Sequence, residues 1–77
     1  MKNFVETIAK QLVSNPDAVS VTEVDGERTT VIELRVAKED FGKVIGKEGR
    51  IAKSIRILLS AASSRGQKKC VLEIIED

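Results

Sequence analysis

The sequence contains no histidine, tryptophan or tyrosine, and its single cysteine is Cys70. One cysteine cannot form a disulfide within the chain, and a zinc site would lack its usual cysteine and histidine ligands. A nucleophilic role for Cys70 is also disfavoured, because no histidine is available to activate its thiol. Alternation with Leu72 and Ile74 favours a buried cysteine on a strand. We therefore expect no disulfide, no metal and no cofactor.

Long apolar runs are missing as well. No stretch approaches the roughly 20 apolar residues that span a bilayer. Glu6 and Lys10 interrupt the N-terminal segment, which lacks the basic-then-apolar layout of a secretory signal. The chain has 77 residues, of which 42% are hydrophobic and 32% charged, as in a small folded domain. We expect one domain, residues 1–77, that is cytoplasmic and has no membrane association.

The residue sets of common enzymes are absent too. The carboxylates are scattered along predicted strands and turns, with no paired acid set. No glycine-rich stretch ends in the Gly-Lys-Ser/Thr of a nucleotide-binding P-loop. We therefore expect no enzyme, assign no catalytic residue and expect no small-molecule substrate.

Apolar residues at three- and four-residue spacing predict three helices. The first covers residues 2–14 and ends before Pro16, because the residue ahead of a proline is pushed out of the α region. Glu39-Asp40 suits the start of a short helix that stops at Gly46. A longer helix runs from Arg50 to about Ser64, with Arg65-Gly66 as its stop. The predicted core faces are Phe4, Val5, Ile8, Leu12 and Val13 on the first helix, Phe41, Val44 and Ile45 on the second, and Ile51, Ile55, Leu58, Leu59 and Ala62 on the third.

Alternating residues predict three strands, over residues 18–24, 28–37 and 68–76. The first two form a hairpin around Asp25-Gly26, where both residues tolerate positive φ. The alternation slips at Glu23-Val24, which suggests a bulge. The resulting order, α-β-β-α-α-β, predicts an α+β fold.

The stretch that carries chemistry is Ile45-Gly46-Lys47-Glu48-Gly49-Arg50-Ile51. Its two glycines let the backbone turn sharply and let another backbone approach closely. The amides that open the following helix carry partial positive charge and suit an anion such as phosphate. Residues 43–56 hold a local charge of +4, whereas the rest of the chain carries −3. The alternative is a plain turn between helices, which would not require this basic cluster.

This motif and the order of elements resemble a K-homology (KH) domain of type II, the bacterial arrangement, and its small stand-alone members in particular. The Ile-Gly-x-x-Gly signature of that family falls on Ile45-Gly46-Lys47-Glu48-Gly49, and Ile55 continues its apolar spacing. The resemblance spans essentially the whole chain. It implies a three-stranded mixed sheet with three helices packed on one face.

The resemblance also implies a function. Such domains bind single-stranded RNA, and their loop clamps about four nucleotides along the backbone. Gly46 and Gly49 would allow close approach of the sugar-phosphate chain, and Lys47 with the amides near Gly49 and Arg50 would meet phosphates. The implied RNA-binding residues are Lys43, Ile45, Gly46, Lys47, Glu48, Gly49, Arg50, Ile51 and Lys53.

Within this set, Ile45 and Ile51 would form an apolar floor under the bases, and Lys43, Arg50 and Lys53 would supply positive field. Glu48 departs from the doubly basic loops of many relatives. The only aromatic residues, Phe4 and Phe41, fall on predicted core faces, so base stacking on exposed rings is not expected and sequence discrimination should be modest. The implied role is a post-transcriptional regulator or RNA chaperone.

One further stripe lies off the core face of the long helix and comprises Ser54, Ile57, Ala61 and Ser64. It is either scattered surface residues or a helix–helix seam, where small residues let two copies approach. A self-complementary seam would give a twofold homodimer. The resemblance likewise implies self-pairing, and pairing with a larger multidomain KH protein of the Jag or KhpB type. The alternative function is therefore a protein-interaction module with a vestigial RNA groove.

Overall fold

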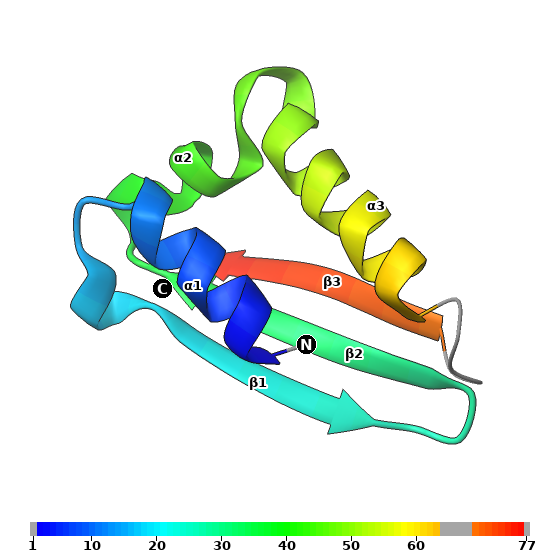
Figure 1. The fold of residues 1–77 in the computed structure, drawn as a ribbon. Coiled ribbons are helices and arrows are strands. Elements are labelled where there is room, and N and C mark those ends of the chain that lie inside the picture. Colours follow the sequence, from blue (N-terminus) through cyan, green and yellow to red (C-terminus); the bar gives the residue numbers. More distant parts are fainter. Residues whose placement is uncertain (1, 64–68, 77) are drawn as a thin grey trace.

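The computed structural model describes residues 2–63 and 69–76, which form a three-stranded sheet with three helices on one face (Figure 1). This confirms the α+β fold and the order α-β-β-α-α-β. The helices are α1 (Lys2–Leu12), α2 (Phe41–Ile45) and α3 (Arg50–Ser63), and the strands are β1 (Ser20–Asp25), β2 (Thr29–Val36) and β3 (Lys69–Glu76). Single-turn 3₁₀ helices lie at Pro16–Ala18, Lys38–Asp40 and Lys47–Gly49. The predicted helix stop at Arg65-Gly66 and the strand start at residue 68 lie outside the described residues.

The sheet is mixed and has the order β1-β2-β3. β1 pairs antiparallel with β2, from Ser20 opposite Arg35 to Asp25 opposite Thr30. β2 pairs parallel with β3, so β1 and β3 are the edge strands. The register of β1 is continuous, so the bulge expected at Glu23-Val24 is wrong. Val24 breaks the alternation because it lies on the sheet face without helices, next to its partner Val31, and is 51% exposed.

The β1–β2 turn forms where Asp25-Gly26 predicts it, but for a different reason. The amide of Gly26 donates to the carbonyl oxygen of Thr29 at 2.9 Å. Among the described residues, positive φ is confined to Gly46, Glu48 and Gly49. Gly26 is required for space instead, since a Cβ there would lie 2.9 Å from the carbonyl oxygen of Thr29. The expectation of positive φ at Gly26 is therefore wrong.

The core lies between the sheet and the three helices, and its fully buried large side chains come from both layers. Two helical core faces differ from expectation. Phe4 and Leu58 are 43% and 49% exposed, and Ala62 is exposed, whereas Ala9 and Ala52 are buried. Small alanines let α1 and α3 approach the sheet closely, which turns the larger side chains toward the edge of the interface. The main buried residues are Val5, Ala9, Val21, Ile32, Leu34, Val36, Val44, Ile55, Leu59 and Leu72.

Candidate functional site

The loop between α2 and α3 has an unusual backbone. Gly46 has φ 79° and ψ 175°, a region that is essentially restricted to glycine. Glu48 follows in the left-handed region with φ 57°, and Gly49 has φ 74°. Three of these four residues thus have positive φ, which makes the chain reverse over one 3₁₀ turn before α3 begins. The two glycines of the motif are both required by the conformation of the backbone.

The surroundings of the two glycines differ. A Cβ on Gly46 would lie 2.6 Å from Cγ1 of Ile51, so Ile51 packs directly against the glycine. No heavy atom lies within 4 Å of the position that a Cβ on Gly49 would take. One side of the loop is therefore packed against α3, and the other side leaves space for a second backbone.

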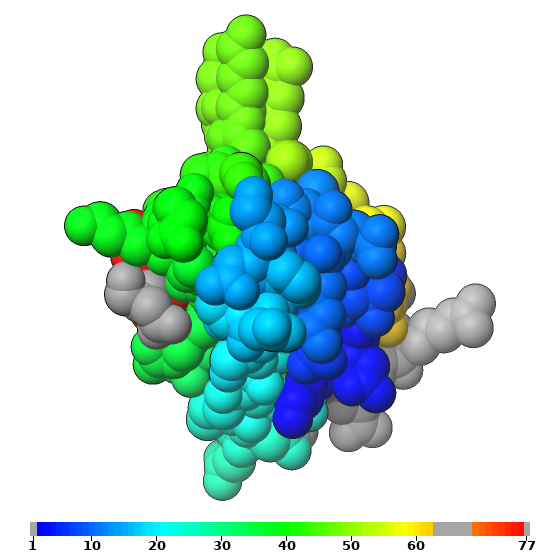
Figure 2. Space-filling view, turned by 90° about the vertical axis from the view of Figure 1, so that its left-hand side faces the viewer, coloured from blue at the N-terminus to red at the C-terminus, as the bar shows by residue number. Residues whose placement is uncertain are grey.

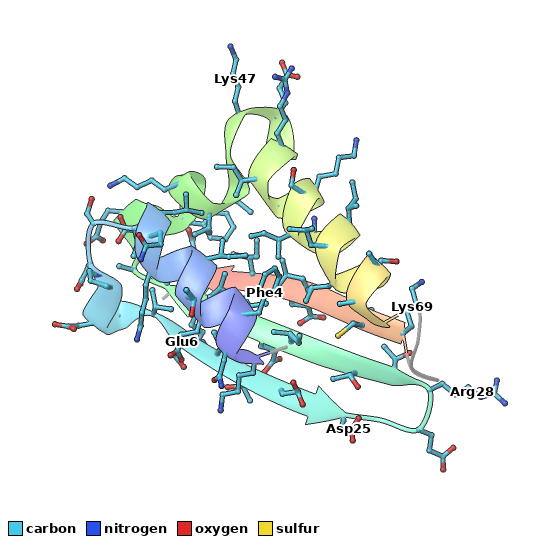
Figure 3. All side chains as sticks on the ribbon, viewed as in Figure 1. Phe4, Glu6, Asp25, Arg28, Lys47 and Lys69 are labelled. Carbon is cyan, nitrogen blue, oxygen red and sulfur yellow. The ribbon has the colours of Figure 1, made fainter. Side chains whose placement is uncertain are left out.

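The loop forms one extremity of the molecule. Figure 2 shows the side chains of this segment extending beyond the rest of the surface. Lys47 points away from the fold, far from the hairpin residue Arg28 (Figure 3). Lys47, Glu48, Arg50 and Lys53 all have exposed or half-exposed side chains. Their charges are accessible to a polymeric ligand.

The backbone amides of the loop have partners within the loop. The amide of Gly49 donates to the carbonyl oxygen of Gly46 at 3.2 Å, and the amide of Arg50 donates to the carbonyl oxygen of Lys47. These two amides were expected to meet phosphates. Because a 3₁₀ turn closes here, their hydrogens already point into the turn. A phosphate would therefore meet the side chains of Lys47 and Arg50 first.

The charges of the loop partly offset each other. The carboxylate of Glu48 lies 3.6 Å from Nη2 of Arg50, and the two side chains are 70% and 75% exposed. An exposed pair of this kind contributes little to stability. It does reduce the positive field that Arg50 presents, and so it leaves Lys47 as the principal unopposed charge of the motif.

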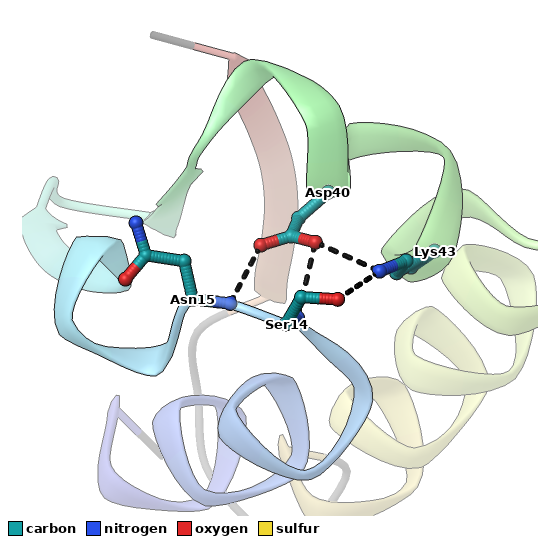
Figure 4. A network of polar contacts seen from close by, with 4 residues as sticks. All are labelled: Ser14, Asn15, Asp40 and Lys43. Carbon is teal, nitrogen blue, oxygen red and sulfur yellow. Dashed lines mark hydrogen bonds and ion pairs between the residues drawn. The ribbon is translucent and has the colours of Figure 1, made fainter.

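Lys43, expected to add positive field at the loop, is directed elsewhere. Its ammonium lies 3.2 Å from Oδ1 of Asp40 and contacts the hydroxyl of Ser14 (Figure 4). Asp40 has no exposed surface, and its carboxylate also accepts the backbone amides of Ser14 and Asn15. The hydrogen bond from Ser14, followed by those from Asn15 and Lys43, lowers the pKa of Asp40, although burial opposes this shift. The prediction from the sequence missed this network, since Glu39-Asp40 indicated only a helix start.

The apolar residues beside the loop, Ile45 and Ile51, are each half-buried. Ile45 precedes Gly46 in the chain and Ile51 packs against it, and the neighbouring Val44 is fully buried in the core. The loop therefore stands on an apolar base that is partly accessible to a ligand.

A pocket of about 240 Å³ lies between α3 and the edge strand β3, and sequence reasoning did not identify it. Nη2 of Arg56 donates to the carbonyl oxygen of Leu72 across it at 3.5 Å. Lys53, Arg56 and Ser60 follow at three- and four-residue spacing on α3, so one face of the helix leads from the loop to this pocket. That spacing was the available signal, but the position of β3 beside it was not readable from the sequence. The lining residues are Arg56, Ser60, Lys69, Cys70, Val71 and Leu72.

Cys70 within this pocket is half-buried. Burial, and to a smaller extent the carboxylate of Glu23, raises the pKa of its thiol. A protonated thiol is a poor nucleophile. Cys70 therefore lines the pocket from β3, and it is half-buried where the alternation predicted a buried residue.

The predicted seam on α3 is exposed where the structure describes it. Ile57 is 62% exposed, Ala61 is exposed, and the hydroxyl of Ser54 donates to the carbonyl oxygen of Arg50 at 2.8 Å. Ser64 lies outside the described residues. Leu58, which sequence reasoning assigned to the core, adds a second large apolar side chain to this surface.

Two site types are absent from the described part of the chain. Over residues 2–63 and 69–76, no three acidic or cysteine side chains gather in a way that would hold a metal ion. No helix among the same residues has the length and apolar character needed to cross a membrane.

Comparison with known proteins places this geometry in context. The family model "KhpA/KhpB, KH domain" matches residues 2–74. The RNA-binding protein KhpA of Clostridium acetobutylicum is 57% identical over 75 residues, which is 97% of this chain and all of the relative. The proteins of the same name from Aquifex aeolicus and Chlamydia caviae are 54% and 52% identical, over 99% and 100% of this chain and 96% and 99% of their own lengths. No solved structure gives a significant match.

Proposed function

Since the chain belongs to the KhpA/KhpB family of KH domains, we propose that it binds single-stranded RNA through the loop Gly46–Gly49 and the adjoining face of α3. The observation that carries this proposal is the open space at Gly49 beside the exposed Lys47. Relatives of nearly the same length are named RNA-binding proteins, which supports the proposal.

In the proposed complex, the sugar-phosphate chain passes along the open side of the loop. Gly49 leaves room for it because any side chain there would occupy that space. Lys47 and Arg50 contact phosphates, and Arg50 exchanges its exposed pairing with Glu48 for the RNA. The two half-buried isoleucines beside the loop, Ile45 and Ile51, provide an apolar base for the first nucleotide.

The bases then lie along α3 and β3. Lys53 leads from the loop to the pocket, and Arg56 and Lys69 supply donors at its rim. About four nucleotides fit such a domain. With no exposed aromatic ring in this pocket, bases are held by apolar contact and hydrogen bonding, and sequence discrimination is modest. About three phosphate contacts imply a slope of log affinity against log salt near −2.

The test is the double variant Lys47→Asp with Glu48→Asp. It places two acids in the loop, and aspartate tolerates the left-handed conformation of residue 48. We expect affinity for a single-stranded RNA to fall by at least about tenfold, because the principal phosphate contact becomes repulsive. Fluorescence anisotropy with a labelled oligonucleotide measures it.

The matched control is Lys2→Asp, which makes the same charge change at an exposed position on α1. It should leave affinity nearly unchanged. Equal affinity of the double variant and the wild type would contradict RNA binding by this loop.

A second function, assembly through α3, is favoured by the exposure of Ile57 and Leu58 on one helix. We propose a homodimer through the seam of Ser54, Ile57, Ala61 and Ser64, and a heterodimer with a larger KH protein as the alternative pairing. Two loops in one dimer would raise the affinity for a strand that reaches both. Such a dimer would act in the cytoplasm as a post-transcriptional regulator or RNA chaperone.

Ile57→Lys tests this assembly, because a charge in the centre of an apolar seam separates the copies. Sedimentation should change from dimer to monomer, while stability of the single chain changes by no more than about 0.5 kcal/mol. Lys53→Glu, an exposed change outside the proposed seam, should leave the dimer intact. A wild type that sediments as a monomer at high concentration would exclude the seam.

A further inference from the structure

The carboxylate of Asp40 joins two segments that are distant in the sequence. Oδ1 accepts the amide of Ser14 and Oδ2 accepts the amide of Asn15, each at 3.0 Å (Figure 4). Both amides belong to the segment that leaves α1, after the last residue of that helix. The ammonium of Lys43 completes the set of partners. This buried carboxylate therefore connects the end of α1 to the start of α2.

This connection differs from the hydrogen bond that an aspartate usually makes at the start of a helix. Asp40 occupies the N-cap of α2, where an aspartate ordinarily accepts an amide of its own helix. Here the side chain makes no such bond within α2. Its backbone amide instead donates to the carbonyl oxygen of Ala37 at 2.9 Å. The carboxylate thus bonds to the segment that follows α1 and not to the amides of α2.

α2 depends on such contacts because it is short. It has five residues, too few to be stable without tertiary packing. Val44 fixes one side of it in the core. Its C-terminal end continues directly into Gly46, which packs against Ile51 with no room for a Cβ. Asp40 and Gly46 lie at opposite ends of α2, about 9 Å apart along the helix axis. A rotation of α2 about Val44 would therefore displace the loop.

We infer that Asp40 is a positioning residue for the loop Gly46–Gly49: its contacts with Ser14, Asn15 and Lys43 hold α2 at the angle that presents the loop to RNA. The inference rests on the proposed function. It assigns Lys43 to this connection and not to the RNA. Neutralising Lys43 should therefore leave the salt dependence of RNA binding unchanged, whereas neutralising Lys47 should reduce the slope by about 0.7.

The test compares Asp40→Asn with Val5→Ala. The first variant keeps the shape of the side chain, removes its charge and replaces one of its two acceptor oxygens by an NH2 group, which cannot accept an amide hydrogen. The second shortens a fully buried residue of α1 and leaves the contacts of Asp40 in place. Both are measured at a temperature at which circular dichroism shows them folded. Lys43→Met is the milder variant, since the carboxylate keeps both backbone amides.

The first readout needs no RNA. The amides of Gly46 and Gly49 are hydrogen-bonded to the carbonyl oxygens of Gly42 and Gly46. Their hydrogen exchange therefore reports the order of the loop. Relative to amides of β2, we expect exchange at these two positions to accelerate by about tenfold in Asp40→Asn and not in Val5→Ala. RNA affinity should fall several-fold in Asp40→Asn only.

Unchanged exchange and unchanged affinity in Asp40→Asn would overturn the inference, and so would equal effects in Val5→Ala, because the role would then be general stability. If the wild type binds no RNA, the proposed function fails. The exchange of Gly46 and Gly49 still decides whether Asp40 orders the loop.

Discussion

Two glycine-containing turns of this molecule reverse the chain, and they do so in opposite ways. The β1–β2 turn is held by hydrogen bonds within the hairpin and to the start of β3. Gly26 donates to Thr29, Thr30 donates to Asp25, and the amide of Lys69 donates to the carbonyl oxygen of Arg28. The α2–α3 loop adopts positive φ at Gly46, Glu48 and Gly49 and extends away from the fold. The first turn closes the sheet, whereas the second retains Glu48 in the left-handed region, which costs a residue other than glycine about 1–3 kcal/mol.

The difference lies in how each glycine is used. At Gly26 the lack of a Cβ allows the close approach of the carbonyl oxygen of Thr29. At Gly46 it allows both the close packing of Ile51 and a φ of 79°. At Gly49 nothing fills the space that the absent Cβ leaves. A glycine at positive φ whose side-chain space is unfilled has no explanation in packing, and this is why we propose that the RNA lies there.

Alanine substitutions separate the packed glycine from the open one, and we expect the largest loss of stability at Gly46. Gly46→Ala combines a backbone region closed to alanine with a Cβ 2.6 Å from Ile51. We expect the free energy of unfolding to fall by about 2–4 kcal/mol. Gly49→Ala, which is strained but has free space, should cost about 1 kcal/mol. Urea unfolding measures both.

The same two variants should rank differently in RNA binding. At a temperature at which both are folded, Gly49→Ala should weaken binding although it is the more stable variant, because its methyl group occupies the path proposed for the RNA backbone. Equal destabilisation by the two variants, or full RNA affinity in Gly49→Ala, would remove the distinction between a packed and an open side of the loop.

Much of this organisation is local and was predictable. The hydrophobic periodicities gave the three helices and three strands, and the spacing of Gly46 and Gly49 with their basic neighbours gave the candidate site. These features depend on residues within a few positions of one another, so they are legible in the sequence.

What failed depends on distant contacts. Asp40 accepts amides 25 and 26 residues away, so nothing next to it in the sequence indicates its partners. The pairing of Lys43 with Asp40 was missed as well, because the position of Lys43 in a basic cluster indicates the loop and not this partner. Phe4 and Leu58 fit a core pattern, but the pattern cannot tell which edge of a wide apolar stripe meets the sheet.

The smallest expected effect is a loss of folding stability at acidic pH. It distinguishes the buried, long-range contacts of Asp40 from the exposed pair of Glu48 and Arg50. The hydrogen bonds from Ser14, then Asn15 and Lys43, lower the pKa of Asp40 in the folded state below the roughly 3.9 of an unfolded chain. The folded state therefore binds this proton less readily than the unfolded state does. The contribution of Asp40 to stability is fully present above about pH 4 and is lost as the pH falls through its folded-state pKa.

Urea unfolding of the wild type and of Asp40→Asn from about pH 6 to pH 2 measures this contribution. The wild type should be more stable at the upper end, and the difference between the two proteins should shrink as the solution is acidified. Glu48→Gln, which removes the carboxylate of an exposed pair, should follow the wild type closely over the same range. A difference between wild type and Asp40→Asn that stayed constant down to pH 2 would mean that the charge of the carboxylate does not stabilise the fold over this range. The cost of Asp40→Asn would then come from the loss of one of the two oxygens that accept the amides of Ser14 and Asn15.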